Sequence, residues 1–540
     1  MKKIKRMMAI AIAIALSVAT CGAFTAFADP EAKAADLADH TYTAYQIFSG
    51  TQSDDETEGK LGNIQWGTAI TDNGAALITE LKKISALSGL ASNASAQAVA
   101  DAISALNYND YSDDAKAIAK AIDNALASGA EGTAVTDGTG LEAGYYLIKD
   151  TTANLKGTDT ARNLSLLQMT KKGKFEIRNK TDVPEVEKKV IDKNDSTPET
   201  SGWQDSADYD VNDAISYKLT GTLPTNYADY DWYRYVFTDT ASKGLTIDTS
   251  SVAVHLDSET GTDITSMFTI AVSDYSGDDA KYTGGQVLTV TANAGTNGTY
   301  LKENASITSE SKIVVTYTAT LNEDAVIGVN GNPNKVDLTY SNNPNKGGEG
   351  DTGKTPEDVN IVFTYKLVVD KIDGTSKDAL KGAGFTLYKK NGSSSAEDKY
   401  EAVGSEVIGT DMTQFAWNRL DDGDYRLVET TTPSGYNTIA PIEFTVTANH
   451  DITAASPTLT SITVTDGKGL TASLAGGTIT KQKGTHTADS GEIFGEVENN
   501  KGATLPETGG SGTTMIYIIG VILLAGAGIL LVTRRRMKAE

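Results

Sequence analysis

The chain has 540 residues, a formal net charge of −24 and a single cysteine, Cys21. This length exceeds what one hydrophobic core supports, so about three domains are expected. The acidic balance disfavours binding to nucleic acid or to anionic membranes, and one cysteine excludes an internal disulfide.

The first 28 residues have the pattern of a secretory signal peptide. Basic side chains precede an apolar stretch at residues 7–18, and residues 26–28 (AFA) offer small side chains for cleavage. A lipoprotein is the alternative and would use Cys21, but Thr20 is a poor residue before a lipidated cysteine. The sequence therefore predicts an exported protein that keeps no cysteine, although disulfides are the usual covalent support outside the cell.

Helical and strand patterns mix in residues 29–180, which predict an α+β domain. Residues 75–127 are rich in Ala, Leu, Ile and Lys at helical spacing. They indicate two or three amphipathic helices, with breaks near Ser92 and near residues 107–112. Segments with strand character flank these helices: 41–48, 144–148 and 175–177.

Residues 183–345 and 359–500 carry strand and turn patterns only. Short segments rich in Val, Thr and Tyr recur between clusters of Gly, Asn and Asp. Over the whole chain, Tyr outnumbers Phe by 23 to 11, which favours exposed antiparallel sheet. A polar Gly-rich stretch between the two regions, 346–358, indicates a linker. The predicted fold class is mainly β, with tandem immunoglobulin-like β-sandwiches and helical insertions in the N-terminal domain.

Strand alternation turns three polar side chains into the interior of residues 359–500. Side chains two positions apart on a strand share a face, and Lys371 shares its face with the apolar Leu367 and Val369. The same reasoning turns Glu429 and Asn499 inward. The region at 183–345 repeats this set in the same chain order, with Lys188, Asp239 and Asn334, and with Lys189 and Asn332 as neighbouring alternatives.

A buried lysine, acid and asparagine can react with one another. Burial lowers the pKa of the lysine and raises that of the acid, so a neutral amine can attack the carboxamide carbon while the protonated acid polarises its carbonyl. Ammonia leaves in a single turnover, and a Lys–Asn isopeptide bond remains. A bond that closes a loop above 100 residues stabilises by roughly 4–5 kcal/mol. Taken singly, each residue is explained by a snorkelling lysine or a turn-capping asparagine, but two regions with one arrangement favour the reaction.

Three signals follow one another in the last forty residues. A pentapeptide precedes an apolar run at 515–532, which is near the lower limit for a membrane-spanning helix, and three arginines follow at 534–536. A simple tail anchor is the alternative interpretation. The pentapeptide is Leu505, Pro506, Glu507, Thr508 and Gly509.

These features together resemble a major (backbone) pilin of sortase-assembled Gram-positive pili with an LPXTG-type sorting signal. Residues 425–436 (YRLVETTTPSGY) resemble the E-box of this family, whose glutamate promotes the isopeptide bond, here Glu429. Residues 382–387 (GAGFTL) resemble the second strand of a collagen-adhesin B-type domain. The segments 184–190 (PEVEKKV), 340–344 (YSNNP) and 497–502 (VENNKG) are also typical of the family.

The resemblance implies that a sortase cleaves between Thr508 and Gly509 and joins the Thr508 carboxyl to a lysine of the next subunit. Lys180 in the segment 175–180 (FEIRNK) corresponds to that acceptor. The match is partial, because Arg178 and Asn179 stand where the family has Tyr-Pro and the upstream tryptophan is missing. Two further lysines are the rivals, Lys174 and Lys171. Residues 41–48 contain no lysine, so no cross-link is expected in the first domain.

The implied protein is the shaft subunit of a covalent pilus on the surface of a Gram-positive bacterium, supporting adhesion and colonisation. Its implied partners are pilus-type and housekeeping sortases, identical subunits, minor pilins and peptidoglycan, and the host ligand is unknown. A singly wall-anchored adhesin or an unpolymerised minor pilin is the alternative. An enzyme, a cofactor or a metal is not expected. The Asn-rich turn at 330–334 completes no calcium loop, and HExxH and GxSxG motifs are absent. Nor is metal-ligand spacing seen among the four histidines, His40, His255, His450 and His486.

Overall fold

The structure is a computed structural model of the chain. It describes residues 40–502 and a few positions between 517 and 534; within 40–502 it leaves out 53–59, 107–111, 128, 136–138, 154, 156–158, 162, 174–182, 198, 294–299, 347–350 and 397. The predicted signal peptide, the 175–177 strand, Lys174, Lys180, the pentapeptide 505–509 and most of the apolar run 515–532 therefore lie outside the described residues. In the part of the chain that is described, no helix has both the length and the apolar character needed to cross a bilayer.

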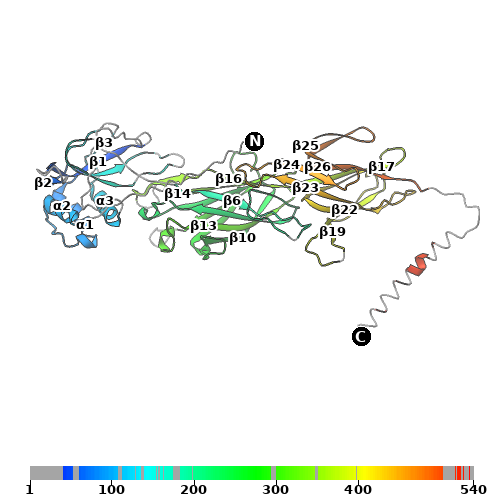
Figure 1. Cartoon of the computed structure of the whole chain (residues 1–540), viewed down its shortest axis with the longest axis horizontal. Coiled ribbons are helices and arrows are strands. Elements are labelled where there is room, and N and C mark those ends of the chain that lie inside the picture. The colour runs from blue at the N-terminus through cyan, green and yellow to red at the C-terminus, as the bar shows by residue number, and fades with distance from the viewer. Residues whose placement is uncertain are drawn as a thin grey trace, which may run out of the picture.

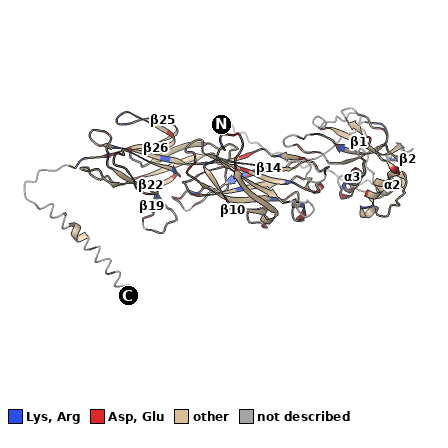
Figure 2. Cartoon of the chain, turned by 180° about the vertical axis from the view of Figure 1, so that it is seen from behind, with Lys and Arg blue, Asp and Glu red and all other residues tan. Residues whose placement is uncertain are grey.

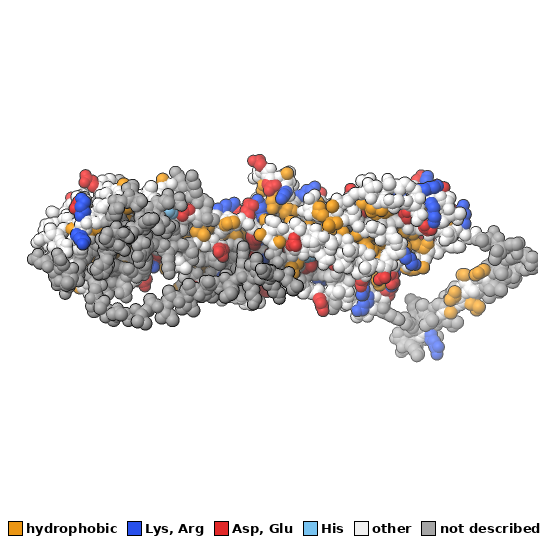
Figure 3. Space-filling model, turned by 45° about the horizontal axis from the view of Figure 1, so that its top comes forward, with side chains coloured by type: hydrophobic (Ala, Val, Ile, Leu, Met, Phe, Trp, Pro, Cys, Tyr) orange, Lys and Arg blue, Asp and Glu red, His pale blue; other side chains and the backbone are white. Residues whose placement is uncertain are grey.

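Three modules follow one another along the long axis of the molecule, in the order of the sequence (Figure 1). Acidic and basic positions are distributed along this length and do not separate into single-sign modules (Figure 2). On the face shown in Figure 3, hydrophobic side chains are visible over the third module and its boundary with the middle one.

The first module packs three helices against one sheet of strand order β2-β1-β4-β5, with β3 pairing β1. The predicted helices are present, and the side chains of Ser95 and Ser112 cap α2 and α3 by accepting hydrogen bonds from the backbone N–H groups of Ala98 and Ala115. Apolar side chains from the helices and from β1 and β4 form one core. The elements are α1 (Ala75–Leu81), α2 (Ala96–Ser104), α3 (Asp113–Ala125), β1 (Tyr42–Gln52), β2 (Leu61–Trp66), β3 (Thr133–Val135), β4 (Gly144–Asp150) and β5 (Ser165–Met169).

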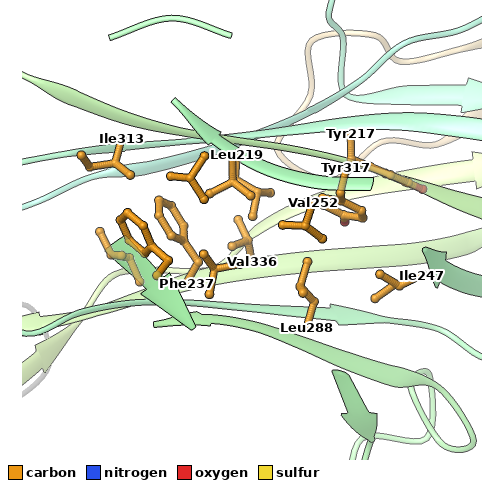
Figure 4. Close-up of a cluster of buried hydrophobic side chains, with 14 of the residues drawn as sticks. Tyr217, Leu219, Phe237, Ile247, Val252, Leu288, Ile313, Tyr317 and Val336 are labelled. Carbon is orange, nitrogen blue, oxygen red and sulfur yellow. The ribbon is translucent and has the colours of Figure 1, made fainter. Parts of the chain in front are cut away.

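The middle module is a sandwich of two sheets with strand orders β10-β13-β8-β6 and β11-β12-β9-β14-β16-β7, and β15 pairs with β14. Its core lies between the sheets, where Leu219, Phe237 and Val336 meet (Figure 4). The strands are β6 (Val186–Val190), β7 (Ser206–Asp208), β8 (Ala214–Thr222), β9 (Tyr235–Ala241), β10 (Leu245–Leu256), β11 (Phe268–Asp274), β12 (Gln286–Ala292), β13 (Lys312–Leu321), β14 (Asn332–Ser341), β15 (Thr352–Lys354) and β16 (Asp358–Phe363).

The third module is a second sandwich, with strand orders β21-β17-β26-β25 and β19-β18-β22-β23-β24, and β20 pairs with β18. Its first and last strands, β17 and β26, are parallel neighbours. The strands are β17 (Tyr365–Asp373), β18 (Gly384–Lys390), β19 (Tyr400–Ala402), β20 (Val407–Ile408), β21 (Gln414–Leu420), β22 (Gly423–Thr431), β23 (Ile442–His450), β24 (Leu459–Thr465), β25 (Thr471–Thr480) and β26 (Thr485–Asn499). Short 3-10 turns elsewhere in the chain are η1 (Asp72–Gly74), η2 (Ser85–Leu87), η3 (Tyr227–Asp229), η4 (Thr265–Met267) and η5 (Tyr300–Glu303).

The prediction that residues 346–358 form a linker is wrong for residues 352–354 and 358, which belong to strands. Strand β15 and the start of β16 lie in this stretch, and both pair with β14 of the middle module. Their polar composition suits strands at or near a sheet edge, where one face meets water. Residues 359–363, assigned to the third region from the sequence, complete the middle sheet, and only Thr364 separates β16 from β17.

Candidate functional site

Lys188, Asp239 and Asn334 meet inside the middle sandwich, and all three are fully buried. Lys188 comes from β6 in one sheet, while Asp239 and Asn334 come from β9 and β14, which are neighbours in the facing sheet. A bond between Lys188 and Asn334 would therefore join the two sheets across the core.

The hydroxyl of Tyr317 on β13 contacts all three side chains. Lys188 Nζ donates to Asp239 Oδ2, and it also donates to the Tyr317 hydroxyl at 2.8 Å. The hydroxyl donates to Asp239 Oδ1 at 2.9 Å and accepts from Asn334 Nδ2 at 2.8 Å. The sequence analysis did not identify Tyr317. The alternation of residues 313–321 does turn Tyr317 toward the core and could have indicated it.

The surroundings of Lys188 favour its neutral form. Burial lowers the pKa of Lys188, and the charge of Asp239 only partly opposes this. Burial also raises the pKa of Asp239. Both shifts favour a neutral amine beside a protonated acid, which is the pair that the predicted reaction requires.

Lys371, Glu429 and Asn499 all lie in the interior of the third sandwich, with at most 4% of each residue exposed. Here Lys371 and Asn499 come from the parallel neighbours β17 and β26 of one sheet, with Asp373 opposite Asn499 in the register. Glu429 reaches Asn499 from β22 in the facing sheet.

The asparagine and the acid of this second cluster are in direct contact. Asn499 Nδ2 donates to both carboxylate oxygens of Glu429, at 2.9 and 3.0 Å, and to the backbone oxygen of Asn437 at 3.0 Å. Lys371 Nζ donates to the backbone oxygen of Val497 at 2.9 Å. Burial lowers the pKa of Lys371 to about 8, against the opposing charge of Glu429.

The amide oxygens Oδ1 of Asn334 and Asn499 share one property. Each is buried and has no hydrogen-bond partner within the described residues. A buried polar atom is normally hydrogen-bonded, so an atom without such a bond needs an explanation. A role in a chemical reaction is one such explanation.

The neighbouring alternatives have other contacts. Lys189 is partly exposed and pairs with Asp205 at 2.6 Å. Asn332 is buried but is fully used, because its amide bonds to the backbone of Val326 and Val362. Lys171, a rival for the acceptor, is exposed.

Three family models match the chain. Residues 211–344 match the Gram-positive pilin backbone subunit 2, Cna-B-like domain. Residues 365–458 match the prealbumin-like fold domain, and residues 497–538 match the LPXTG cell wall anchor motif. The last match makes the chain a surface protein anchored to the cell wall.

Relatives with known names agree with these matches. The trypsin-resistant surface T6 protein of Streptococcus pyogenes serotype M6 is 28% identical over 371 residues, which cover 60% of this chain and 64% of that protein. The structure of the T6 backbone pilin of that serotype aligns with a TM-score of 0.46 at 18% identity, over 86% of this chain and 96% of that one. The major pilin SpaA of Corynebacterium diphtheriae aligns with a TM-score of 0.42 at 13% identity, over 86% and 95%. Both TM-scores are below 0.5, so the classification depends on the sequence matches. By these matches, the chain contains a Gram-positive pilin backbone domain and an LPXTG cell wall anchor motif, and it is similar in sequence to a streptococcal surface T6 protein.

Proposed function

We propose that this protein is the repeating shaft subunit of a covalent pilus and that each of its two β-sandwich modules forms one internal isopeptide bond. The observation that carries the proposal is the recurrence of a buried lysine, acid and asparagine in two successive modules. A buried charge is costly unless it is paired or discharged, so this recurrence calls for a common chemical reason.

The bonds would form between Lys188 and Asn334 and between Lys371 and Asn499. The neutral amine attacks the amide carbon, and the acid, Asp239 or Glu429, donates its proton to the carbonyl oxygen Oδ1. Rotation of the asparagine side-chain amide by 180° exchanges the positions of Oδ1 and Nδ2. Oδ1 then faces the acid and can accept its proton. The tetrahedral intermediate expels ammonia, which carries away the Nδ2 atom, and the acid recovers a proton from the amine. Packing supplies the rate, because fixed partners reach effective molarities of roughly 10⁵ M or more.

Such bonds would change how tension passes through the subunit. A pull would enter at Lys188, cross to Asn334, continue along the backbone to Lys371, cross to Asn499 and leave toward the anchor motif. The strands between each bonded pair would carry no load. Strands β15 and β16 lie between the two bonds and would depend on their hydrogen bonds to β14.

Polymerisation would join the subunits end to end. A pilus-type sortase would transfer the Thr508 carboxyl of one subunit to the Lys180 amine of the next, and a housekeeping sortase would attach the last subunit to peptidoglycan. Minor pilins would complete the fibre. The protein would act here as substrate and structural material, not as an enzyme.

Polymerisation is tested on cell-wall extracts separated after boiling in detergent. We expect a ladder of high-mass species in the wild type and in the control Lys171→Ala, and a single band in Lys180→Ala. A ladder in Lys180→Ala would remove the acceptor assignment. Absence of any ladder in the wild type would instead favour a singly anchored adhesin or minor pilin.

The internal bonds are tested independently by the intact mass of recombinant residues 29–500. We expect a mass lower than the mass calculated for these residues by two ammonia molecules. A full sequence mass would contradict both bonds without affecting the polymerisation test.

A further inference from the structure

The backbone of Lys188 lies on the open edge of its sheet. Strand β6 is the last in the order β10-β13-β8-β6, so β8 is its neighbour on one side only. Along β6, Ile191 donates to the backbone oxygen of Ser216 on the β8 side at 3.1 Å. Val190 instead exchanges both of its backbone hydrogen bonds with Gln204 on the open side, at 2.8 and 2.9 Å. Because alternate residues of a strand direct their backbone groups to opposite sides, Lys188 directs its own to the open side, where they need partners.

Two side chains of β16 provide these partners. Asp358 Oδ2 accepts a hydrogen bond from the backbone N–H of Lys188 at 2.6 Å. Asn360 Nδ2 donates to the backbone oxygen of Lys188 at 3.1 Å and to that of Asp205, also at 3.1 Å. Asn360 is fully buried. The two side chains therefore hold both backbone groups of the lysine, in the place that a neighbouring strand would otherwise occupy.

The same strand also lies beside the asparagine of this site. Strand β16 pairs antiparallel with β14, with Asn360 opposite Asn334 and Asp358 opposite Val336. Side chains of directly opposite residues share one face of a sheet, so those of Asn334 and Asn360 project together toward the sheet that contains Lys188. The Lys188 amine and the Asn334 amide are each 2.8 Å from the Tyr317 hydroxyl. Strand β16 thus fixes the backbone of the lysine relative to the strand that carries its reaction partner.

Provided that the Lys188–Asn334 bond of the proposed function forms, we propose that Asp358 and Asn360 are its positioning residues. In that reaction a bond forms between Lys188 Nζ and Asn334 Cγ, the bond from Cγ to Nδ2 breaks, and one amine proton leaves with Nδ2 as ammonia. Asp358 and Asn360 exchange no atoms and act by geometry. A lysine side chain has many rotamers, so holding its backbone removes one source of misplacement. A misplacement of 1 Å can slow a reaction between fixed groups by about 10²-fold.

This arrangement sets an order of events in the middle module. Strand β16 follows all three reactive residues in the chain, and it lies beyond residue 344, where the match to the pilin backbone domain ends. The backbone of Lys188 is held only after β16 has paired with β14. The middle bond is therefore completed only after the chain has folded through residue 363. Since only Thr364 separates β16 from β17, this step takes place directly beside the start of the third module.

Recombinant residues 29–500, collected unfolded in denaturant and then refolded, test the two residues. Masses of digested samples taken at intervals follow the cross-linked peptide of each module separately. We expect Asp358→Ala and Asn360→Leu to slow the middle bond by about 10–100-fold and to leave the third-module bond at its wild-type rate. The matched control is Glu357→Ala, which removes a more exposed neighbouring acid whose partner is Lys335 at 2.8 Å. It should react like the wild type.

A conservative variant and a bond-free background separate positioning from folding. Asp358→Asn keeps an oxygen that accepts from the Lys188 N–H, so we expect it to react close to the wild-type rate. In the background Asn334→Ala, where the middle bond cannot form, Asp358→Ala and Asn360→Leu should still melt cooperatively above the refolding temperature. Variants that are unfolded at that temperature would assign these residues to folding and overturn the positioning role.

The wild type distinguishes failure of this role from failure of the bond. A wild type that keeps its full mass would reject the Lys188–Asn334 bond, and the role of Asp358 and Asn360 with it. A wild type that forms the bond while Asp358→Ala and Asn360→Leu form it equally fast would reject the positioning role alone.

Discussion

The middle and third modules hold the same three residue types in different strand geometries. In the middle module the lysine stands alone on one sheet and faces the acid and the asparagine on the other. In the third module the lysine and the asparagine are on adjacent parallel strands and the acid faces them from the opposite sheet. The proposed bond would join two sheets in the first case and two strands of one sheet in the second.

The difference shows that the reaction would depend on proximity and burial, not on one strand arrangement. It also leaves different polar neighbours around each lysine. Lys188 contacts an acid and a tyrosine hydroxyl, whereas the hydrogen bond of Lys371 is to a backbone oxygen. Variants that affect one module and not the other are therefore the sharpest tests.

The largest effect is expected from replacing the acids. Asp239→Asn and Glu429→Gln each remove one proton donor, and we expect bond formation in the affected module to slow by about 10²–10⁴-fold. Intact mass after purification should then exceed the wild-type mass by one ammonia for each variant. Glu406→Gln, on the exposed side of the third module, is the control. If Glu429→Gln lost ammonia to the same extent as the wild type, the third module would not need its acid for bond formation.

Loss of a bond is expected to destabilise each module by a similar amount. Asn334→Ala and Asn499→Ala each open a loop of more than 100 residues, so the free energy of unfolding of that module should fall by about 4–5 kcal/mol. Chemical denaturation measures it. Adding Lys188→Met to Asn334→Ala should cost much less than the first change, since the bond is already lost. Two full, additive losses would mean that no bond links these residues.

Tyr317→Phe is expected to affect the middle module only. The hydroxyl contacts the lysine, the acid and the asparagine, and removing a hydrogen-bonding group from a buried network costs about 1–3 kcal/mol. We therefore expect isopeptide bond formation in the middle module to slow by about 10–100-fold. The mass of the chain, measured at intervals during refolding, reports this rate. An equal slowing in the third module would contradict a local role.

The smallest and most gradual effect is the pH dependence of modules without their bonds. Burial lowers the pKa of unlinked Lys371 to about 8, below its ordinary 10.5, so in Asn499→Ala, where the lysine stays free, the unfolded chain is expected to bind more protons than the folded one on the alkaline side. Stability of the third module should therefore rise with pH across this window and fall as pH drops toward 8. Asn334→Ala should show the same direction for Lys188 on the alkaline side.

The middle module should show one further dependence. The folded pKa of Asp239 lies above its ordinary 3.8, so stability from the protonated acid is present at low pH and is lost as pH rises through the folded value. Denaturant midpoints of Asn334→Ala and Asn499→Ala measured between pH 4 and pH 10 compare the two profiles. Adding Lys371→Met to Asn499→Ala should abolish the alkaline rise. A rise that persists would assign it to another group.

Much of the fold and of the candidate site follows from local patterns. Alternation along residues 363–371 and 233–239 was enough to predict that Lys371 and Asp239 are buried, because a strand with one apolar face has only one side to turn inward. The helices of residues 75–127 follow from the helical spacing of their apolar residues, and the structure adds the capping serines Ser95 and Ser112.

Local patterns failed where pairing is decided at a distance. The stretch at 346–358 is polar and Gly-rich, yet β14 offers a partner that makes part of it a strand. Tyr317 belongs to the site only because β13 lies across the core from β9. Asp208 lies more than 200 positions before Asp421 and Asp422, which it meets at the boundary between the middle and third modules, so a local pattern could not predict this group.

The sequence by itself determined the anchor motif, the module types and the inward direction of the six reactive candidates, and it predicts an export signal, since these depend on residues a few positions apart. Only the tertiary structure decided which sheet holds each candidate, where one module ends and which carboxylates face each other between modules. These features depend on long-range strand pairing and on the packing of one sheet against another, which a linear pattern of apolar and polar residues does not encode.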